Sequence, residues 1–421
     1  MRNLMAYLES ARGMNRNAHL FLAHTLLSGS SIALLALLYN LYITSLGYKQ
    51  DMIGTVTLVA CTVGVVAALP AGYALNRLGY KRALIVAVLL TGFSMVLPLM
   101  FPVSAVLIGC ELFWGIGFTL LIIAGAPFMT ENSTETQRAP LFSLQFVLTM
   151  LTAFVGNLVG GALPRWFGGW LGAGAESAQA YQGALYVGAA LMFLSAVPFI
   201  FVRQNRPDKN AHPARPRLRI EHPVAVTKLL APYIIGGVGA GMFVPFANVL
   251  WKTTQNVSDA TIGSIFALSA LVMVGAGMFA PMLSQRFGQV RVMVVFQSAA
   301  VIGLFAFGAA PFLGIALLGY LTRDVLTNLV RPIFGQFMMD HSAPAERAAV
   351  SALATMGFNF AWGVSSWVSG VWQSENQLLW VYVASAGFSV LAIGAMQYFF
   401  GGAAARRAVQ TAKRPLGSPA E

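Results

Sequence analysis

Long runs of apolar residues, broken by short polar or charged stretches, extend along the whole chain. A helix that crosses the hydrocarbon core of a bilayer needs about 20 predominantly apolar residues. Backbone groups in lipid must be satisfied within the segment, so each run is predicted to be a helix. The pattern predicts twelve spans, at residues 19–46, 51–75, 83–101, 103–128, 140–164, 182–202, 227–250, 259–284, 290–310, 312–338, 347–372 and 378–401.

The composition agrees with an all-α membrane protein. Of the 421 residues, 57% are hydrophobic and 10% are charged, and the mean hydropathy is +0.70. A soluble domain carries about a quarter charged residues. Twelve spans and their connections leave no room for a soluble domain of useful size. The sequence contains no Walker A loop, metal-ligand cluster or nucleophile motif, so we expect neither an enzyme nor a bound metal or cofactor.

One segment interrupts the apolar pattern. Residues 203–223 are basic, rich in proline and without apolar periodicity, as expected of a linker. Six predicted spans precede this segment and six follow it. The expected organisation is an N-terminal six-helix bundle at 1–202, a cytoplasmic linker at 203–225, a C-terminal six-helix bundle at 226–402 and a cytoplasmic tail at 403–421.

The basic residues explain the formal net charge of +12 without a nucleic-acid partner. If the N-terminus is inside, 21 of the 26 Lys and Arg residues lie in cytoplasmic segments and three lie in outer loops. Cytoplasmic loops of membrane proteins carry such an excess. We therefore expect a multi-pass protein of a bacterial inner membrane with both termini in the cytoplasm.

The two halves of the chain repeat each other at a constant offset of 209 residues. The matches are Asn76, Arg77 and Gly79 with Gln285, Arg286 and Gly288; Ile53 and Gly54 with Ile262 and Gly263; residues 126–139 with 335–348; and residues 156–161 with 365–370. Because each half holds an even number of spans, the repeats run in the same direction through the membrane.

The loop that follows the second predicted span carries the most specific motif. It reads GYALNRLGYKR from Gly72 to Arg82, and its second copy, PMLSQRFGQVR, keeps Arg286, Gly288 and Arg291. This loop resembles the GxxxDRxGxRR motif of the major facilitator superfamily. The resemblance covers nearly the whole chain and implies twelve helices in two parallel-repeat bundles, with solute transport by alternating access.

The same resemblance implies a cytoplasmic gate. Gly72 is expected to let helices approach closely and Gly79 to permit a tight turn. Asn76 stands where the family has an acidic residue, which puts the family's charge relay in doubt. The predicted gate residues are Gly72, Asn76, Arg77, Gly79, Lys81, Arg82, Glu131, Arg138, Arg286, Gly288, Asp340 and Arg347.

A small-residue motif lies in the fifth predicted span. GNLVGG, which contains Gly156, Asn157, Gly160 and Gly161, resembles the GPxxGG core associated with drug:proton antiporters, with Asn157 in place of the usual proline. The alternative interpretation is a face of small residues on which helices pack.

Ionisable residues inside predicted spans are functional candidates, because a charge at mid-bilayer costs about 2.5–3.5 kcal/mol on insertion scales. Glu111 lies in the fourth span, and Arg323, Asp324 and Arg331 lie in the tenth. The resemblance implies that these two spans line one central cavity. The predicted substrate and coupling residues are Glu111, Trp114, Arg323, Asp324, Asn328, Arg331, Asn40 and Asn248.

Two interpretations of these charges remain open. In the functional one, Arg323 binds a polar or anionic group of the solute, while Glu111 or Asp324 carries a coupling proton. In the structural one, Arg323 and Asp324 neutralise each other within the bundle. The preferred function is proton-coupled efflux of a small organic solute by a monomer surrounded by lipid. The alternatives are uptake or exchange of an organic anion, and a nontransporting sensor with the same fold.

Overall fold

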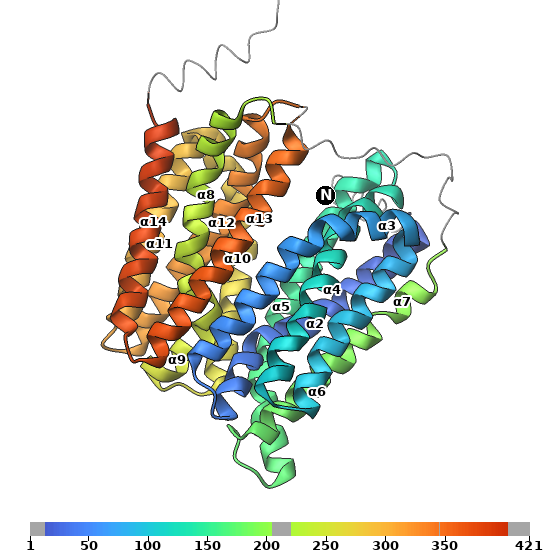
Figure 1. Ribbon diagram of the computed structural model, residues 1–421, viewed down its shortest axis with the longest axis vertical. Helices are drawn as coiled ribbons and strands as arrows, with labels where there is room; N and C mark the ends of the chain where they lie inside the picture. The colour runs from blue at the N-terminus through green and yellow to red at the C-terminus, as the bar shows by residue number, and fades with distance from the viewer. Residues whose placement is uncertain (1–12, 204–219, 345, 403–421) are drawn as a thin grey trace, which may run out of the picture. The chain divides into compact units, whose positions relative to one another are not determined.

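The computed structural model describes residues 13–203, 220–344 and 346–402, and every regular element in these ranges is helical. Figure 1 shows the chain as a series of long helices. The helices of the first half are α2 (Arg16–Ser45), α3 (Gln50–Met100), α4 (Ser104–Glu131), α5 (Glu135–Leu171), α6 (Ala178–Leu194) and α7 (Val197–Ile200). Those of the second half are α8 (Pro223–Phe243), the 3-10 turn η1 (Val244–Phe246), α9 (Ala247–Gln255), α10 (Asp259–Phe287), α11 (Gln289–Gly308), α12 (Leu313–Asp340), α13 (Arg347–Ser374) and α14 (Leu378–Phe400).

Helices occupy all twelve predicted ranges, but eleven segments of the described chain are long and apolar enough to cross a membrane. Helix α3 supplies two of them, Gln50–Ala68 and Pro70–Met100, and its non-helical residue Gly79 lies within the second. The predicted span at 347–372 corresponds to α13, which is not among the eleven. Polar residues along this helix, such as Ser351, Thr355 and Asn359, lower its hydropathy.

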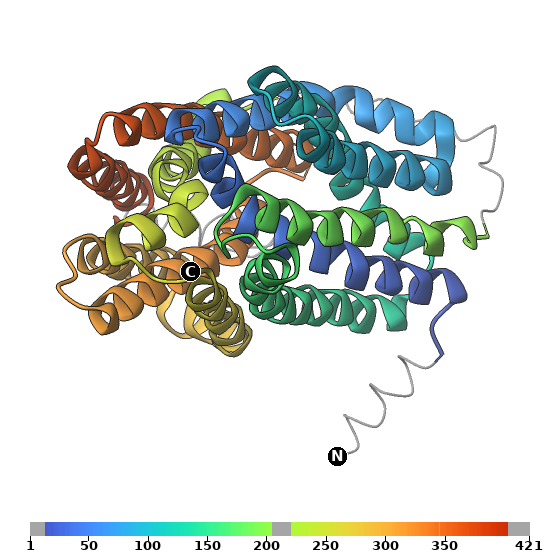
Figure 2. The same ribbon diagram turned by 90° about the horizontal axis from the view of Figure 1, so that it is seen from below.

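The helices form two compact units. Among the described residues, unit 1 comprises 13–203, 245–274 and 366–376, and unit 2 comprises 220–244, 275–344, 346–365 and 377–402. In unit 1, α2 packs between α5 and α6, as Figure 2 shows. In unit 2, α11 packs on both α12 and α14, and α14 also packs on α8. The predicted domain boundaries remain a prediction, and most of the linker and the whole tail lie outside the described residues.

Each unit has its own apolar core. The core of unit 1 includes Phe128 and Phe199, and that of unit 2 includes Phe337 and Val350. Many large apolar side chains are nevertheless exposed, among them Val66 and Trp166. Because lipid rather than water surrounds the spans, this exposure is expected.

The 209-residue repeat extends to the backbone. Gly79, inside α3, has φ +72°, and its repeat partner Gly288, which separates α10 from α11, has φ +85°. Only glycine adopts such values without strain. The expected turn at Gly79 is therefore confirmed, and the second half has the same turn at the equivalent position.

Equivalent side-chain contacts tie the helices together in both halves. Gln137, at the start of α5, donates a hydrogen bond of 2.9 Å to the carbonyl of Gly13. Its repeat partner Glu346 accepts a hydrogen bond of 2.9 Å from the amide of His222, which is the repeat partner of Gly13. In both halves this contact joins the beginning of one helix to the segment that leads into another.

Glycines mark close helix contacts in unit 1. A Cβ atom on Gly263 would collide with the backbone of Asn157 and Gly161, and one on Gly54 would collide with the backbone at Ser366. These two contacts are repeat equivalents. Gly72 behaves differently, because a Cβ there would meet nothing within 4 Å. The expectation that Gly72 permits close helix approach is therefore wrong for this structure.

The carboxylate of Glu346 provides a pH-dependent test of the contact before α8. Its side chain is buried, and the backbone hydrogen bond from His222 holds its pKa below the ordinary value of 4.5. A carboxyl whose pKa is lower in the folded than in the unfolded protein stabilises the folded state at pH values above the ordinary pKa. This stabilisation is lost as the pH falls through the folded-state pKa. We expect Glu346→Gln to lower the apparent Tm at pH 7, and the difference from wild type to vanish at low pH. Glu135→Gln, at an exposed site, is the control, and an unchanged Tm for Glu346→Gln at pH 7 would contradict the assignment.

The glycine contacts provide a second test. Gly263→Val should overpack the contact of α10 with α5 and destabilise the protein by about 1–3 kcal/mol. Gly275→Val changes the same helix where a Cβ meets nothing within 4 Å, so it should have a much smaller effect. Apparent Tm values of the two purified variants check this. Equal values would show that the close approach at Gly263 does not limit stability.

Candidate functional site

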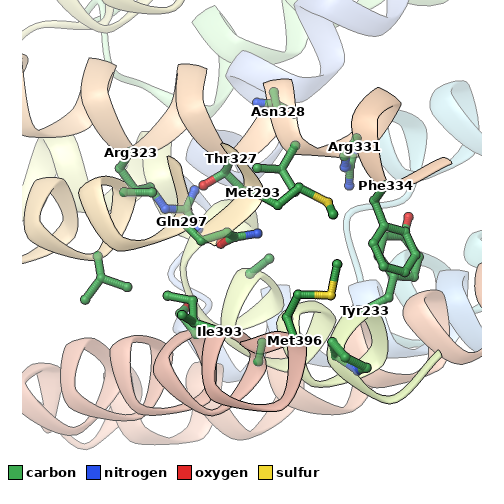
Figure 3. Close-up of a pocket in the computed structure, with 18 of the residues that line it drawn as sticks. Tyr233, Met293, Gln297, Arg323, Thr327, Asn328, Arg331, Phe334, Ile393 and Met396 are labelled. Atoms are coloured by element: carbon green, nitrogen blue, oxygen red, sulfur yellow. The ribbon is translucent and has the colours of Figure 1, made fainter. Parts of the chain in front are cut away.

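A cavity of about 140 Å³ lies within unit 2. Helices α8, α11, α12, α13 and α14 supply its walls. Four of the predicted site residues line it together, namely Arg323, Asp324, Asn328 and Arg331. Figure 3 shows how the labelled side chains surround the space.

The polar side of the cavity is a stripe along α12. Arg323, Thr327 and Arg331 follow one another at four-residue spacing, which places them on one face of a helix. Helix α11 approaches this face closely, because Gly303 and Gly319 pack against each other's backbones and a Cβ on Gly303 would also meet the amide of Arg323. The two glycines thus bring α11 against α12 beside Arg323.

Arg323 is 5% exposed, and its guanidinium carbon lies 4.4 Å from the centre of the Phe243 ring. Its side chain extends toward Thr327 and Gln297, and these three polar groups face the same part of the cavity (Figure 3). Asn328 donates a hydrogen bond of 3.2 Å to Oδ1 of Asp324. Arg323, Asp324 and Arg331 are the charged residues of the lining, so its formal charge is +1.

Aromatic side chains form one end of the cavity. The ring of Tyr233 stacks on Phe334 with a centroid distance of 4.5 Å and on Phe358 with a distance of 4.7 Å. Arg331 lies over Phe358, at 5.3 Å from its ring centre. This stack joins α8, α12 and α13 beside the cavity.

Several lining residues were not singled out by the sequence. Gln297 is a polar residue in an apolar run, which is a signal that could have identified it. Tyr233, Phe334 and Phe358 carry no such signal, because aromatic residues are common in apolar spans. Only the packing of three helices brings these rings together.

Four predicted cavity residues lie in unit 1 rather than in this lining. Asn40 donates a hydrogen bond of 3.5 Å to Oδ1 of Asn248, and Asn248 donates one of 2.7 Å to the carbonyl of Leu37. Trp114 stacks on Phe118 with centroids 5.3 Å apart. The expectation that Glu111 and the α12 charges share one space remains a prediction.

Glu111 is a buried carboxyl in α4, with 8% of its surface exposed. Its electrostatic neighbours are Tyr39 of α2, Cys61 of α3 and the adjacent Cys110. Among the described residues, no Lys, Arg or His side chain forms an ion pair with it. Unlike the carboxylate of Asp324, this one has no arginine beside it in the sequence.

A charged cluster that the sequence analysis did not identify lies at the ends of α6, α9 and α10. Lys252 forms ion pairs of 2.8 Å with Asp259 and 3.0 Å with Glu176, and it contacts the Tyr181 hydroxyl at 2.7 Å. Tyr181 in turn donates a hydrogen bond of 2.8 Å to Asp259. The sequence signal was Lys252 itself, one of three basic residues assigned to outer loops.

The predicted gate residues of the first half contact residues of the same half. Lys81 donates hydrogen bonds to the carbonyls of Ile200 at 2.6 Å and Val202 at 3.1 Å, and so ties α3 to the end of α7. Arg77 lies over the ring of Tyr73.

The second half shows similar local contacts. Arg286 lies over Phe287, and Arg347 donates to the carbonyl of Met339. Gln289 donates a hydrogen bond of 3.1 Å to Asp340. The remaining charged or amide gate residues are exposed, namely Asn76, Arg82, Glu131 and Arg138.

The motif in α5 lies against neighbouring backbones and side chains. A Cβ on Gly156 would meet Ala33, one on Gly160 would meet Leu34, and one on Gly161 would meet the backbone of Asp259. Oδ1 of Asn157 is buried and accepts no hydrogen bond from the described residues. These contacts agree with the packing interpretation of the motif.

Solved transporters have the same fold. The chain is similar to the nucleoside transporter NupG, with a TM-score of 0.71 and 16% identity over 92% of this chain and 99% of that one. It is similar to a D-xylose-proton symporter, with a TM-score of 0.69 and 16% identity over 93% and 98%. It also resembles a bacterial homolog of a human lysosomal transporter, Spinster, in an inward-facing conformation, with a TM-score of 0.69 and 14% identity over 96% and 99%.

Two comparisons use the sequence alone, one with curated proteins and one with family models. No curated protein sequence matches the chain. The model described as Major Facilitator Superfamily matches residues 20–366 and 229–420. These matches include the motif loop, its second copy and both helices that carry intramembrane charges. The chain therefore belongs to the major facilitator superfamily.

Proposed function

We propose that the protein is a proton-coupled secondary transporter that moves a small organic solute across a bacterial inner membrane by alternating access. In this proposal α13 is the eleventh of twelve spans, both termini are cytoplasmic, and the transporter works as a monomer. The family and the structural neighbours support the transport class. One of those neighbours is a D-xylose-proton symporter, and its name states that its transport is coupled to protons.

The buried carboxyl of Glu111 carries the proposal of proton coupling. An ionised carboxylate without a cationic partner is costly inside a membrane, so its protonated form is favoured there. When water reaches the side chain, the ionised form becomes favourable and the proton can leave. A conformational cycle that alternately hides and hydrates Glu111 would therefore bind a proton on one side of the membrane and release it on the other.

Export is the preferred direction, and it rests on the resemblance of GNLVGG to the motif of drug:proton antiporters. Uptake or exchange of an organic anion is the second candidate, favoured by the two arginines of the cavity in unit 2. Both directions can use the same proton-carrying side chain. A nontransporting sensor is the remaining alternative, and transport by the purified protein would exclude it.

The predicted gate residues are proposed to set the balance between inward-facing and outward-facing states. The two positive-φ glycines support this role, since Gly79 and Gly288 provide equivalent turns in both halves. Lys81 holds the first of these turns against the end of α7 through two carbonyls. Asn76 is exposed beside that turn, so an amide stands where relatives carry an acid.

Glu111→Gln tests the proposed coupling. The amide keeps the shape and hydrogen-bonding capacity of the side chain but cannot release a proton. In proteoliposomes we expect Glu111→Gln to abolish uphill accumulation driven by a pH gradient, while exchange of solute at equal pH on both sides continues. The solute would be chosen by a ligand-stabilisation screen of drugs, organic acids and sugars.

Glu135→Gln removes an exposed carboxylate at the start of α5 and serves as the matched control. It should retain gradient-driven accumulation. Infrared spectroscopy provides a readout without any solute, because the band of a protonated buried carboxyl should disappear in Glu111→Gln alone. Full gradient-driven accumulation by Glu111→Gln would show that another group carries the proton.

A further inference from the structure

The cavity in unit 2 has a group of polar side chains at one part, whereas Arg331 lies with the aromatic side chains at another. Arg323, Thr327 and Gln297 face one another across its polar part, as Figure 3 shows. Met293, Met396 and other apolar side chains line most of the rest. A ligand that matches both parts has one compact polar group and an apolar body.

We propose that this cavity binds an amphipathic organic monocarboxylate, with its carboxylate at Arg323, Thr327 and Gln297. The proposal rests on the proposed transport function and names the chemical class of the solute. It assigns the binding site to residues of unit 2 alone, including Gln297 of α11.

The polar part has the donors that a carboxylate requires. A guanidinium presents N–H groups in a planar fork that matches two carboxylate oxygens. The guanidinium of Arg323 contacts the face of the Phe243 ring. This ring has no oxygen atom that would compete with a ligand carboxylate for the N–H groups of Arg323. The Thr327 hydroxyl and the Gln297 amide can each donate a further hydrogen bond.

The charge of the lining indicates one negative charge on the ligand. The two guanidinium groups of Arg323 and Arg331 are offset by one carboxylate, that of Asp324, which leaves a net charge of +1. The Asp324 carboxylate also accepts a hydrogen bond from Asn328. A monoanion would neutralise the cavity, whereas a cation would increase its excess positive charge.

The apolar part selects against small hydrophilic anions and sugars. A sugar would need polar partners on every side. Most polar groups of this lining lie along α12 and at Gln297, and the hydroxyls of Ser385 and Ser389 on α14 donate to backbone carbonyls. Met293 and Met396 have flexible, polarisable side chains that adapt to apolar bodies of different shape. The stacked ring of Tyr233 offers an aromatic surface at the end of the cavity.

Calorimetric titration of the purified full-length protein tests the proposal with three probes of similar shape. They are 3-phenylpropionate, its neutral analogue 3-phenylpropionamide and the cation 3-phenylpropylamine. We expect the carboxylate to bind at least about tenfold more tightly than the amide, because a charge-assisted pair with arginine is much stronger than a neutral hydrogen bond. Equal binding of carboxylate and amide, preferential binding of the amine, or no binding of the carboxylate would each overturn the proposal.

Variants of Arg323 test whether this residue causes the tighter binding of carboxylate than of amide. Arg323→Gln should remove the preference for carboxylate and leave amide binding unchanged, which also shows that the variant is folded. Arg323→Lys should keep a weaker preference, because an ammonium supplies charge without the planar fork. Arg165→Gln changes an exposed arginine of α5 and should bind all three probes like wild type. A preference that persists in Arg323→Gln would place the carboxylate elsewhere and overturn the assignment.

Glu111→Gln separates this proposal from the proton-coupling proposal. It should retain carboxylate binding in the calorimeter even though coupling is lost. If wild type accumulates another solute by proton coupling and does not bind 3-phenylpropionate, the solute class is wrong and the coupling proposal stands. If carboxylate binding is present while Glu111→Gln still couples, the coupling assignment alone fails.

Discussion

The lack of hydrogen-bonding solvent inside a bilayer is the constraint on which this structure depends. It forces the backbone of each span into a helix, and it makes each buried charge costly. Pro127 and Pro332 lie inside helices, a position that membrane-spanning helices tolerate when other groups satisfy the freed carbonyls. The same constraint makes intramembrane charges few and therefore informative. Glu111 and the charged stripe of α12 place ionisable groups within largely apolar helices.

Repetition of one helical plan in the two halves explains much of the remaining architecture. Gly79 and Gly288 make equivalent turns, and Gln137 and Glu346 make equivalent contacts to the segments before α2 and α8. Contacts that hold the helices of one half together can recur in the other half, because equivalent helices pack against each other in both. Side chains that face solute need not be kept. Trp114 of α4 occupies the position that corresponds to Arg323 of α12.

This divergence suggests a division of chemistry between the two halves. The first half contains a buried carboxyl, at Glu111, that can hold or release a proton. The second half contains a cavity with excess positive charge and an apolar wall. Proton binding in one half and anion binding in the other would let a conformational cycle couple two separate sites. Such coupling requires only that both sites favour the same state of the transporter.

The sequence alone determined the helical class, eleven of the apolar spans, the 209-residue repeat and the polar stripe on α12. These features follow from local composition and periodicity, which any apolar helix in lipid must obey. Tertiary structure decided that Gln297 and Tyr233 join Arg323 in one cavity, and that Asn40 binds Asn248 in unit 1. It also decided that Gly263, rather than Gly72, marks a close helix contact. A glycine or aromatic residue has the same local signature whether it faces lipid, a cavity or another helix, so its role is set by the neighbours that folding brings to it.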